Sequence, residues 1–201
     1  VSWLSVQAAR NADVLGGRFL DLSINTLSLA SLSAGITVFV ALLIALAVSM
    51  APSAWTRLSQ RIATLGYAFP GALLAVGLYV PVAAAFGYAG QWGFSQSFVG
   101  SGILLLLVGY GVRFLAVGHA PIASGLLRLR PSIVEAARLS GCGTLRIISG
   151  IHLPLLRTSV MTAALLVFVD VMKEMPITLM MRPFGWDTFA TRIFEFSREG
   201  E

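Results

Sequence analysis

Two long stretches of the sequence contain no charged side chain. The first runs from Leu22 to Thr56 and the second from Ile62 to Val112. Runs of about 18 or more apolar residues without charge are typical of transmembrane helices, because nothing in the bilayer core solvates a charge. Only 11% of the residues are charged, whereas soluble domains contain roughly a quarter. The chain is therefore predicted to be an all-α, multi-pass transmembrane helical bundle.

Four membrane spans are expected from the apolar runs. About 20 residues cross the hydrocarbon core at about 1.5 Å per residue. Pro70 lies inside the second span and is expected to kink it, while Pro121 is expected to mark a change of direction after the third. Glycines of the third span, such as Gly109, Gly111 and Gly118, allow close helix approach. The predicted spans are residues 25–50, 62–86, 98–120 and 158–175.

The arginines indicate the orientation of these spans. They gather in residues 51–61 and 126–157, whereas residues 87–97 contain none. Basic loops stay in the cytoplasm, so residues 126–157 are predicted to be a cytoplasmic loop. Arg113 is expected to snorkel to an interface. The high pI of about 10.1 is then explained by the arginines of the cytoplasmic segments. It does not indicate a nucleic-acid partner, and none is predicted.

The same orientation divides the chain into three parts. Residues 1–22 are predicted to be an extracytoplasmic tail, and residues 23–181 form the transmembrane domain. Residues 182–201, which alternate acids, arginines and aromatics, are predicted to be an extracytoplasmic amphipathic segment, either helix or loop.

A fixed pattern marks the basic loop. Glu135-Ala136-Ala137 is followed after three residues by Gly141, then after nine residues by Ile151, and then by Leu153-Pro154. Pro131 favours a helix start, and Gly141 permits a turn with positive φ. Leu153-Pro154 is expected to end the second part of the loop. A compact helix across the ends of the spans can transmit a rigid-body movement from a bound partner.

This pattern resembles the EAA loop of binding-protein-dependent ABC permeases, the MetI-like inner membrane components. The resemblance implies a MetI-like bundle whose loop docks, as a coupling helix, on an ABC ATPase subunit that binds the ATP. Alternatively, Glu135 only offsets neighbouring arginines. The residues implied in ATPase coupling are Glu135, Ala136, Ala137, Gly141, Ile151, Leu153 and Pro154.

A second resemblance lies downstream. Residues 168–179, together with Arg182-Pro183-Phe184-Gly185, Asp187-Thr188 and Arg192, resemble iron(III)-type permeases, with Met175 where leucine is usual. This implies a C-terminal half that lacks its final span and pairs with a second permease half or a fused N-terminal half. A periplasmic substrate-binding protein and a bacterial inner membrane are also implied. Thiamine, polyamine and phosphonate remain alternative substrates.

Asp170, Lys173 and Glu174 are ionisable groups at predicted membrane depth. They could line the translocation path, or Asp170 and Lys173 could form an ion pair within the helix. An intramembrane enzyme with Asp170 and Glu174 as paired carboxylates is a further alternative. A simple membrane anchor would leave the loop pattern unexplained.

No catalytic or metal site is predicted from the remaining residues. His119 and His152 are far apart and lack ligand spacing with a cysteine or carboxylate. The sequence contains no P-loop, G-x-S-x-G, H-E-x-x-H or C-x-x-C pattern. The chain is therefore expected to be a transport subunit without a bound cofactor, and ATP hydrolysis is assigned to a partner.

Overall fold

The computed structural model describes residues 2–90, 102–183 and 185–199, and within them the side chains of residues 19–84, 102–183 and 185–198. These residues form helices and contain no strand, which confirms the predicted all-α class. In chain order the elements are α1 (Ser2–Met50), α2 (Ala54–Thr64), the 3₁₀-helix η1 (Leu65–Ala68), α3 (Gly71–Gly90), α4 (Gly102–Leu127), α5 (Pro131–Leu139), α6 (Thr144–Ile147), the π-helical turn η3 (Ile148–His152), α7 (Leu153–Met172), α8 (Pro176–Met181) and α9 (Phe189–Glu199).

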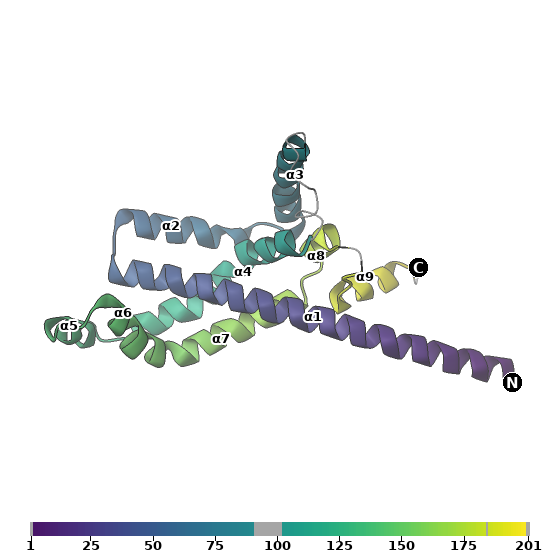
Figure 1. The fold of residues 1–201 in the computed structure, drawn as a ribbon, viewed down its shortest axis with the longest axis horizontal. Coiled ribbons are helices and arrows are strands. Elements are labelled where there is room, and N and C mark those ends of the chain that lie inside the picture. The colour runs from purple at the N-terminus through teal and green to yellow at the C-terminus, as the bar shows by residue number, and fades with distance from the viewer. Residues whose placement is uncertain (1, 91–101, 184, 200–201) are drawn as a thin grey trace.

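Three long helices, α1, α4 and α7, pack against one another and enclose the core (Figure 1). Small and aliphatic side chains fill the contact, among them Ala41, Ile122 and Val167, which are fully buried. Three helical segments are long and apolar enough to cross a membrane, and the bent pair of α2–η1 and α3 would make a fourth. The three segments are Phe19–Met50, Gly102–Leu127 and Thr144–Met172.

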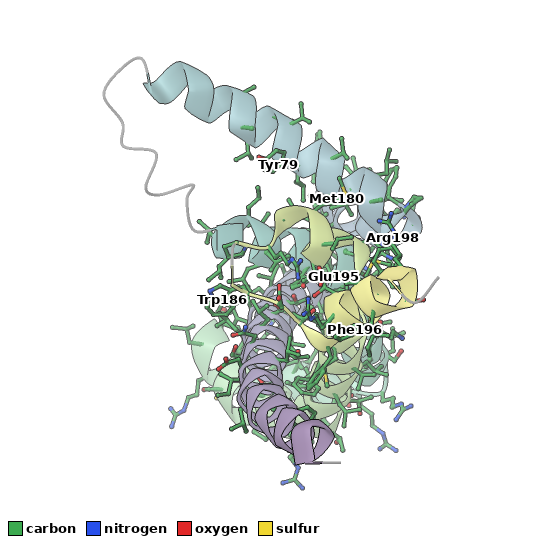
Figure 2. All side chains as sticks on the ribbon, turned by 90° about the vertical axis from the view of Figure 1, so that its right-hand side faces the viewer. Tyr79, Met180, Trp186, Glu195, Phe196 and Arg198 are labelled. Carbon is green, nitrogen blue, oxygen red and sulfur yellow. The ribbon has the colours of Figure 1, made fainter. Side chains whose placement is uncertain are left out.

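The bundle has two distinct ends, which we call the α5 end and the α9 end (Figure 1). The α5 end contains the last turns of α1 and α4, the helices α5 and α6, and the start of α7. The α9 end contains α8, α9 and the outer part of α1. Helix α3 stands away from the bundle near the α9 end, and Figure 2 shows it with Tyr79 on its exposed surface.

Helix α1 begins well before its apolar part. The segment of α1 that is apolar enough to span a membrane starts at Phe19, but the helix itself starts at Ser2. The segment predicted as a tail is thus continuous with the first long helix.

The second predicted span, residues 62–86, is broken at Pro70, where a kink was expected. Helix α2 begins at Ala54, where Ser53 forms a capping box with Thr56, and the chain then bends by 113° between η1 and α3. Pro70 explains the break, because its ring disfavours the helical conformation at the preceding residue. Phe69 is accordingly extended, with φ −85° and ψ 142°.

Two other prolines do not act as predicted. Pro121 lies inside α4, which continues to Leu127. Leu153-Pro154 does not end a separate part of the loop, because the chain is helical without interruption from Thr144 to Met172. The π-helical turn Ile148–His152 directly precedes Leu153. In a π-helical turn each backbone N–H bonds the carbonyl five residues earlier instead of four. The turn lies next to Pro154, which has no backbone N–H to donate.

Some predictions fall on residues 91–101 and 184, which lie outside the described part of the chain: most of the predicted loop 87–97, the start of the third span, and Phe184. Among the described glycines, Gly118 packs closely, since a Cβ there would lie 3.3 Å from Val167. Gly111 has open space instead. The predicted role in close helix packing is therefore confirmed for Gly118 and wrong for Gly111.

Candidate functional site

Helix α5 is defined at both ends by its sequence. It starts at Pro131, which suits the first helical position because proline lacks the N–H that would have no partner there. It ends at Leu139, and Gly141, two residues further on, has a φ of +77°, which confirms the predicted turn. The Cys142 amide donates to the Ala137 carbonyl and the Gly141 amide to the Arg138 carbonyl, each at 3.0 Å. This is a Schellman motif, and it fixes the length of α5.

The structure divides the predicted coupling residues into two groups. Glu135, Ala136, Ala137 and Gly141 belong to α5 and its cap, and all but the half-buried Ala137 are exposed. Ile151, Leu153 and Pro154 belong to the separate helical run that leads into α7. His152, next to the second group in sequence, lines the same cavity as Glu135, so both groups border this cavity.

Helix α5 presents two different faces. Pro131, Val134 and Arg138, spaced three and four residues apart, line a cavity against the ends of α1 and α4. Ser132 and Ala136 lie four apart on the opposite side and are exposed. A partner that approaches from outside the bundle therefore meets small side chains, which permit close contact.

Exposed leucines at the α5 end were missed by the sequence reasoning. Leu127, Leu139 and Leu145 are 87%, 90% and 82% exposed. Leu127 ends the apolar segment of α4, whereas Leu139 and Leu145 lie among the basic residues of the loop. The available signal was a leucine next to arginine in a segment too polar to span the membrane.

A second polar cluster lies where α4 meets the junction between α7 and α8. Arg113 Nε of α4 is 3.2 Å from Glu174 Oε2, and their side chains are only 19% and 7% exposed. Arg113 was expected to snorkel, but Glu174 holds it inside the protein. Arg113 Nη1 also donates to the Phe69 carbonyl at 2.8 Å. The sequence separation of Arg113 and Glu174 explains why spacing rules did not find this pair.

This ion pair joins two breaks in helical structure. Phe69 lies at the bend between η1 and α3. Glu174 lies between α7 and α8, where its Oε1 accepts the Ile177 amide at 3.3 Å. Irregular backbone at membrane depth needs such partners, because lipid provides none. The pair therefore satisfies polar groups at both breaks.

A buried hydroxyl pair secures α8 beside this cluster. Tyr110 Oη of α4 lies 2.5 Å from Thr178 Oγ1, and both side chains are fully buried. The Thr178 hydroxyl in turn donates to the Glu174 carbonyl at 2.7 Å. Helix α8 is thus bound to α4 next to the ion pair.

The other two predicted path residues pair with each other. Lys173 Nζ lies 2.7 Å from Asp170 Oδ1, as the spacing predicted. Lys173 is largely exposed, whereas Asp170 is mostly covered. The three ionisable residues therefore separate into this surface pair and the buried Glu174.

A network of charges organises the α9 end. Arg182 pairs with Asp187 and, at 2.6 Å, with Glu195 of α9, and Glu195 also accepts from Arg192 at 2.8 Å. The hydrogen bond from Arg192, followed by that from Arg182, holds the pKa of Glu195 below its ordinary value. Figure 2 shows Glu195 on α9, close to the end of the bundle.

The same loop is attached to α1. The Asn25 side-chain amide donates to the carbonyls of Gly185 and Asp187, each at 3.3 Å. The Phe189 amide donates to the Thr26 hydroxyl at 3.1 Å. The first long helix and the segment 185–189 therefore form one hydrogen-bonded unit.

These features define a helical membrane protein with a capped, exposed helix in a basic segment at one end and an internal ion pair at its helix breaks. The family model of the binding-protein-dependent transport system inner membrane component matches residues 37–191. The chain belongs to this family, whose members are permease subunits of ABC transport systems in the inner membrane. Such systems also contain an ATPase and a substrate-binding protein. A search among curated proteins found no match.

Proposed function

We propose that the chain is the permease subunit of an ABC importer whose α5 end lies in the cytoplasm. The arginines support this orientation, because basic segments remain on the cytoplasmic side. Arg128, Arg130, Arg138 and Arg146 all lie at the α5 end and are exposed. Residues 2–18 and α9 then lie toward the extracytoplasmic side.

In this proposal α5 is the coupling helix that docks on the ATPase subunit. The observation that carries it is the exposed, capped α5, which turns the small side chains of Ser132 and Ala136 away from the bundle. Glu135 has no cation within ion-pair distance in the part of the chain that the structure describes, so it does not offset a neighbouring arginine by contact. Leu139 and Leu145 extend the docking surface.

The translocation path is proposed to pass the Arg113–Glu174 pair. Helix breaks at membrane depth are typical of transporter sites, since they free polar backbone groups and can rearrange. Both breaks of this chain meet at the pair. Asp170 and Lys173 would lie beside the path, toward the extracytoplasmic side.

The proposed cargo is iron(III), carried to the permease by a periplasmic binding protein that contacts the α9 end. The resemblance of residues 168–192 to iron(III)-type permeases supports this substrate. Thiamine, polyamine and phosphonate are the alternative cargoes. A second permease half, separate or fused, would complete the path.

The intramembrane-enzyme alternative receives no support from the site. It needs Asp170 and Glu174 to face a shared water pocket as paired carboxylates. The structure instead engages Asp170 with Lys173 and Glu174 with Arg113.

The docking proposal is tested by Ala136→Arg in the intact transporter. A long cation on the small, outward face of α5 blocks close approach of another protein. We expect the ATPase subunit to be lost on purification and uptake to fall to background. Ser59→Arg is the matched control, because it adds the same side chain to an exposed position of α2. Normal assembly and uptake in the Ala136→Arg variant would refute the docking role.

The cargo is tested separately, by uptake of radiolabelled iron(III) in cells that depend on this transporter. We expect excess unlabelled iron(III), and not thiamine, polyamine or phosphonate, to compete. Competition by one of the other compounds would replace iron as the cargo and leave the docking proposal unchanged.

A further inference from the structure

A cavity of about 440 Å³ lies behind α5, on the side opposite its outward face. One wall is α5, and the other walls are the ends of α1 and α4. These are also the ends of two apolar spans, at Met50 and Leu127. The cavity therefore lies where hydrocarbon gives way to the polar interface, at the depth of lipid headgroups.

The cavity carries positive charge that no acidic side chain neutralises by contact. Arg130 and Arg138 line it, and within the described residues neither has an acid within ion-pair distance. Glu135 is the one acid among the lining residues, so two guanidinium groups face one carboxylate. The net charge of +1 complements a phosphodiester, which carries one negative charge.

A buried ring nitrogen of a histidine that lines the cavity also lacks a hydrogen-bond partner. His152 lines the cavity, is only 3% exposed, and its Nδ1 has no hydrogen-bond partner among the described residues. A buried polar atom without a partner is costly. His152 therefore places an unsatisfied imidazole nitrogen within the wall of the cavity.

The remaining lining is apolar and comes from the ends of the spans, including Met50, Leu126 and Leu129. A soluble phosphate compound would gain nothing from this surface. A lipid would place its phosphate between the arginines and lead its acyl chains past these side chains into the bilayer. The combination of charge, depth and apolar lining thus selects an amphiphile.

We propose that this cavity binds the headgroup of an anionic phospholipid from the leaflet that borders the α5 end. The identification of that leaflet as the cytoplasmic one rests on the proposed orientation, but the site itself does not. The bound headgroup would fill the space between α5 and the span ends. It would thereby brace the coupling helix from behind, while the opposite face stays free for the ATPase subunit.

The test compares two double variants of the intact transporter purified in detergent. Arg130→Gln with Arg138→Gln removes the cavity arginines. Arg128→Gln with Arg146→Gln removes the same charge from the same loop but from residues outside the cavity lining. Native mass spectrometry measures the phosphatidylglycerol retained by each protein, with phosphatidylcholine as the neutral comparison.

We expect the Arg130→Gln/Arg138→Gln variant to bind phosphatidylglycerol roughly thirtyfold more weakly, because it loses two cationic contacts to the lipid phosphate. The Arg128→Gln/Arg146→Gln control should retain as much of this lipid as the native protein. Equal loss in both variants, or equal retention of phosphatidylcholine, would overturn the site. Displacement of the lipid by millimolar inorganic phosphate would show a free-phosphate site instead. ATPase co-purification, measured on the same samples, separates this outcome from failure of the docking proposal.

Discussion

The sharpest prediction concerns the buried Arg113–Glu174 pair. Glu174→Gln keeps the shape of the side chain and an oxygen for the Ile177 amide, so the main loss is the charge opposite Arg113. Removing one partner of a buried ion pair costs about 3–5 kcal/mol, because the other charge stays buried without compensation. Arg113 is 19% exposed and keeps its bond to the Phe69 carbonyl. We therefore expect the lower end, about 3 kcal/mol.

The assay is equilibrium unfolding of the purified transporter, with a double-mutant cycle. Arg113→Gln alone should be as damaging as Glu174→Gln, and the double variant should recover part of the loss, with a coupling of about 1–3 kcal/mol. Asp170→Asn is the matched control, because it removes a carboxylate one turn away whose partner Lys173 is exposed. Equal losses in the Glu174→Gln and Asp170→Asn variants, or additive effects in the cycle, would refute the reasoning.

Three further outcomes are expected. Gly141→Ala forces a side chain into φ +77°, which costs roughly 1–2 kcal/mol and should speed hydrogen exchange of the α5 amides, unlike Gly143→Ala, where φ is −69°. Tyr110→Phe removes a buried hydrogen bond and should lower the unfolding free energy by about 1 kcal/mol; an unchanged value would contradict the bond. The pKa of Glu195 is lowered in the folded protein, so its stabilisation is complete above the ordinary carboxyl pKa and is lost as pH falls through the lowered one. Amide protection in α9 should fall in that acidic range, and Glu195→Gln should remove the pH dependence.

The membrane spans were predictable because they depend on composition over long stretches. Most of α1 lies in the charge-free run from Leu22 to Thr56, and the only charged residues in α4 and α7 are Arg113, Arg157 and Asp170. The turn at Gly141 was predictable for a similar reason, since a glycine that follows a short helix with a proline start is a local signal. Its φ of +77° depends on few distant contacts.

The bend at Pro70 and the pairing of Glu174 depend on tertiary contacts. Proline permits a break, but the angle of 113° is set by neighbours such as the Arg113 guanidinium on the Phe69 carbonyl. Spacing along a helix identified Lys173 as a partner for Asp170. The same rule cannot find a partner for Glu174 that comes from another helix.

The attachment of Asn25 to the 185–187 loop limits how the far end of the protein can move. One amide group holds the carbonyl oxygens of Gly185 and Asp187, so the loop cannot slide along α1 without giving up both bonds. Any opening that displaces this loop must either carry the first helix with it as a single body or start by exchanging these two bonds for water.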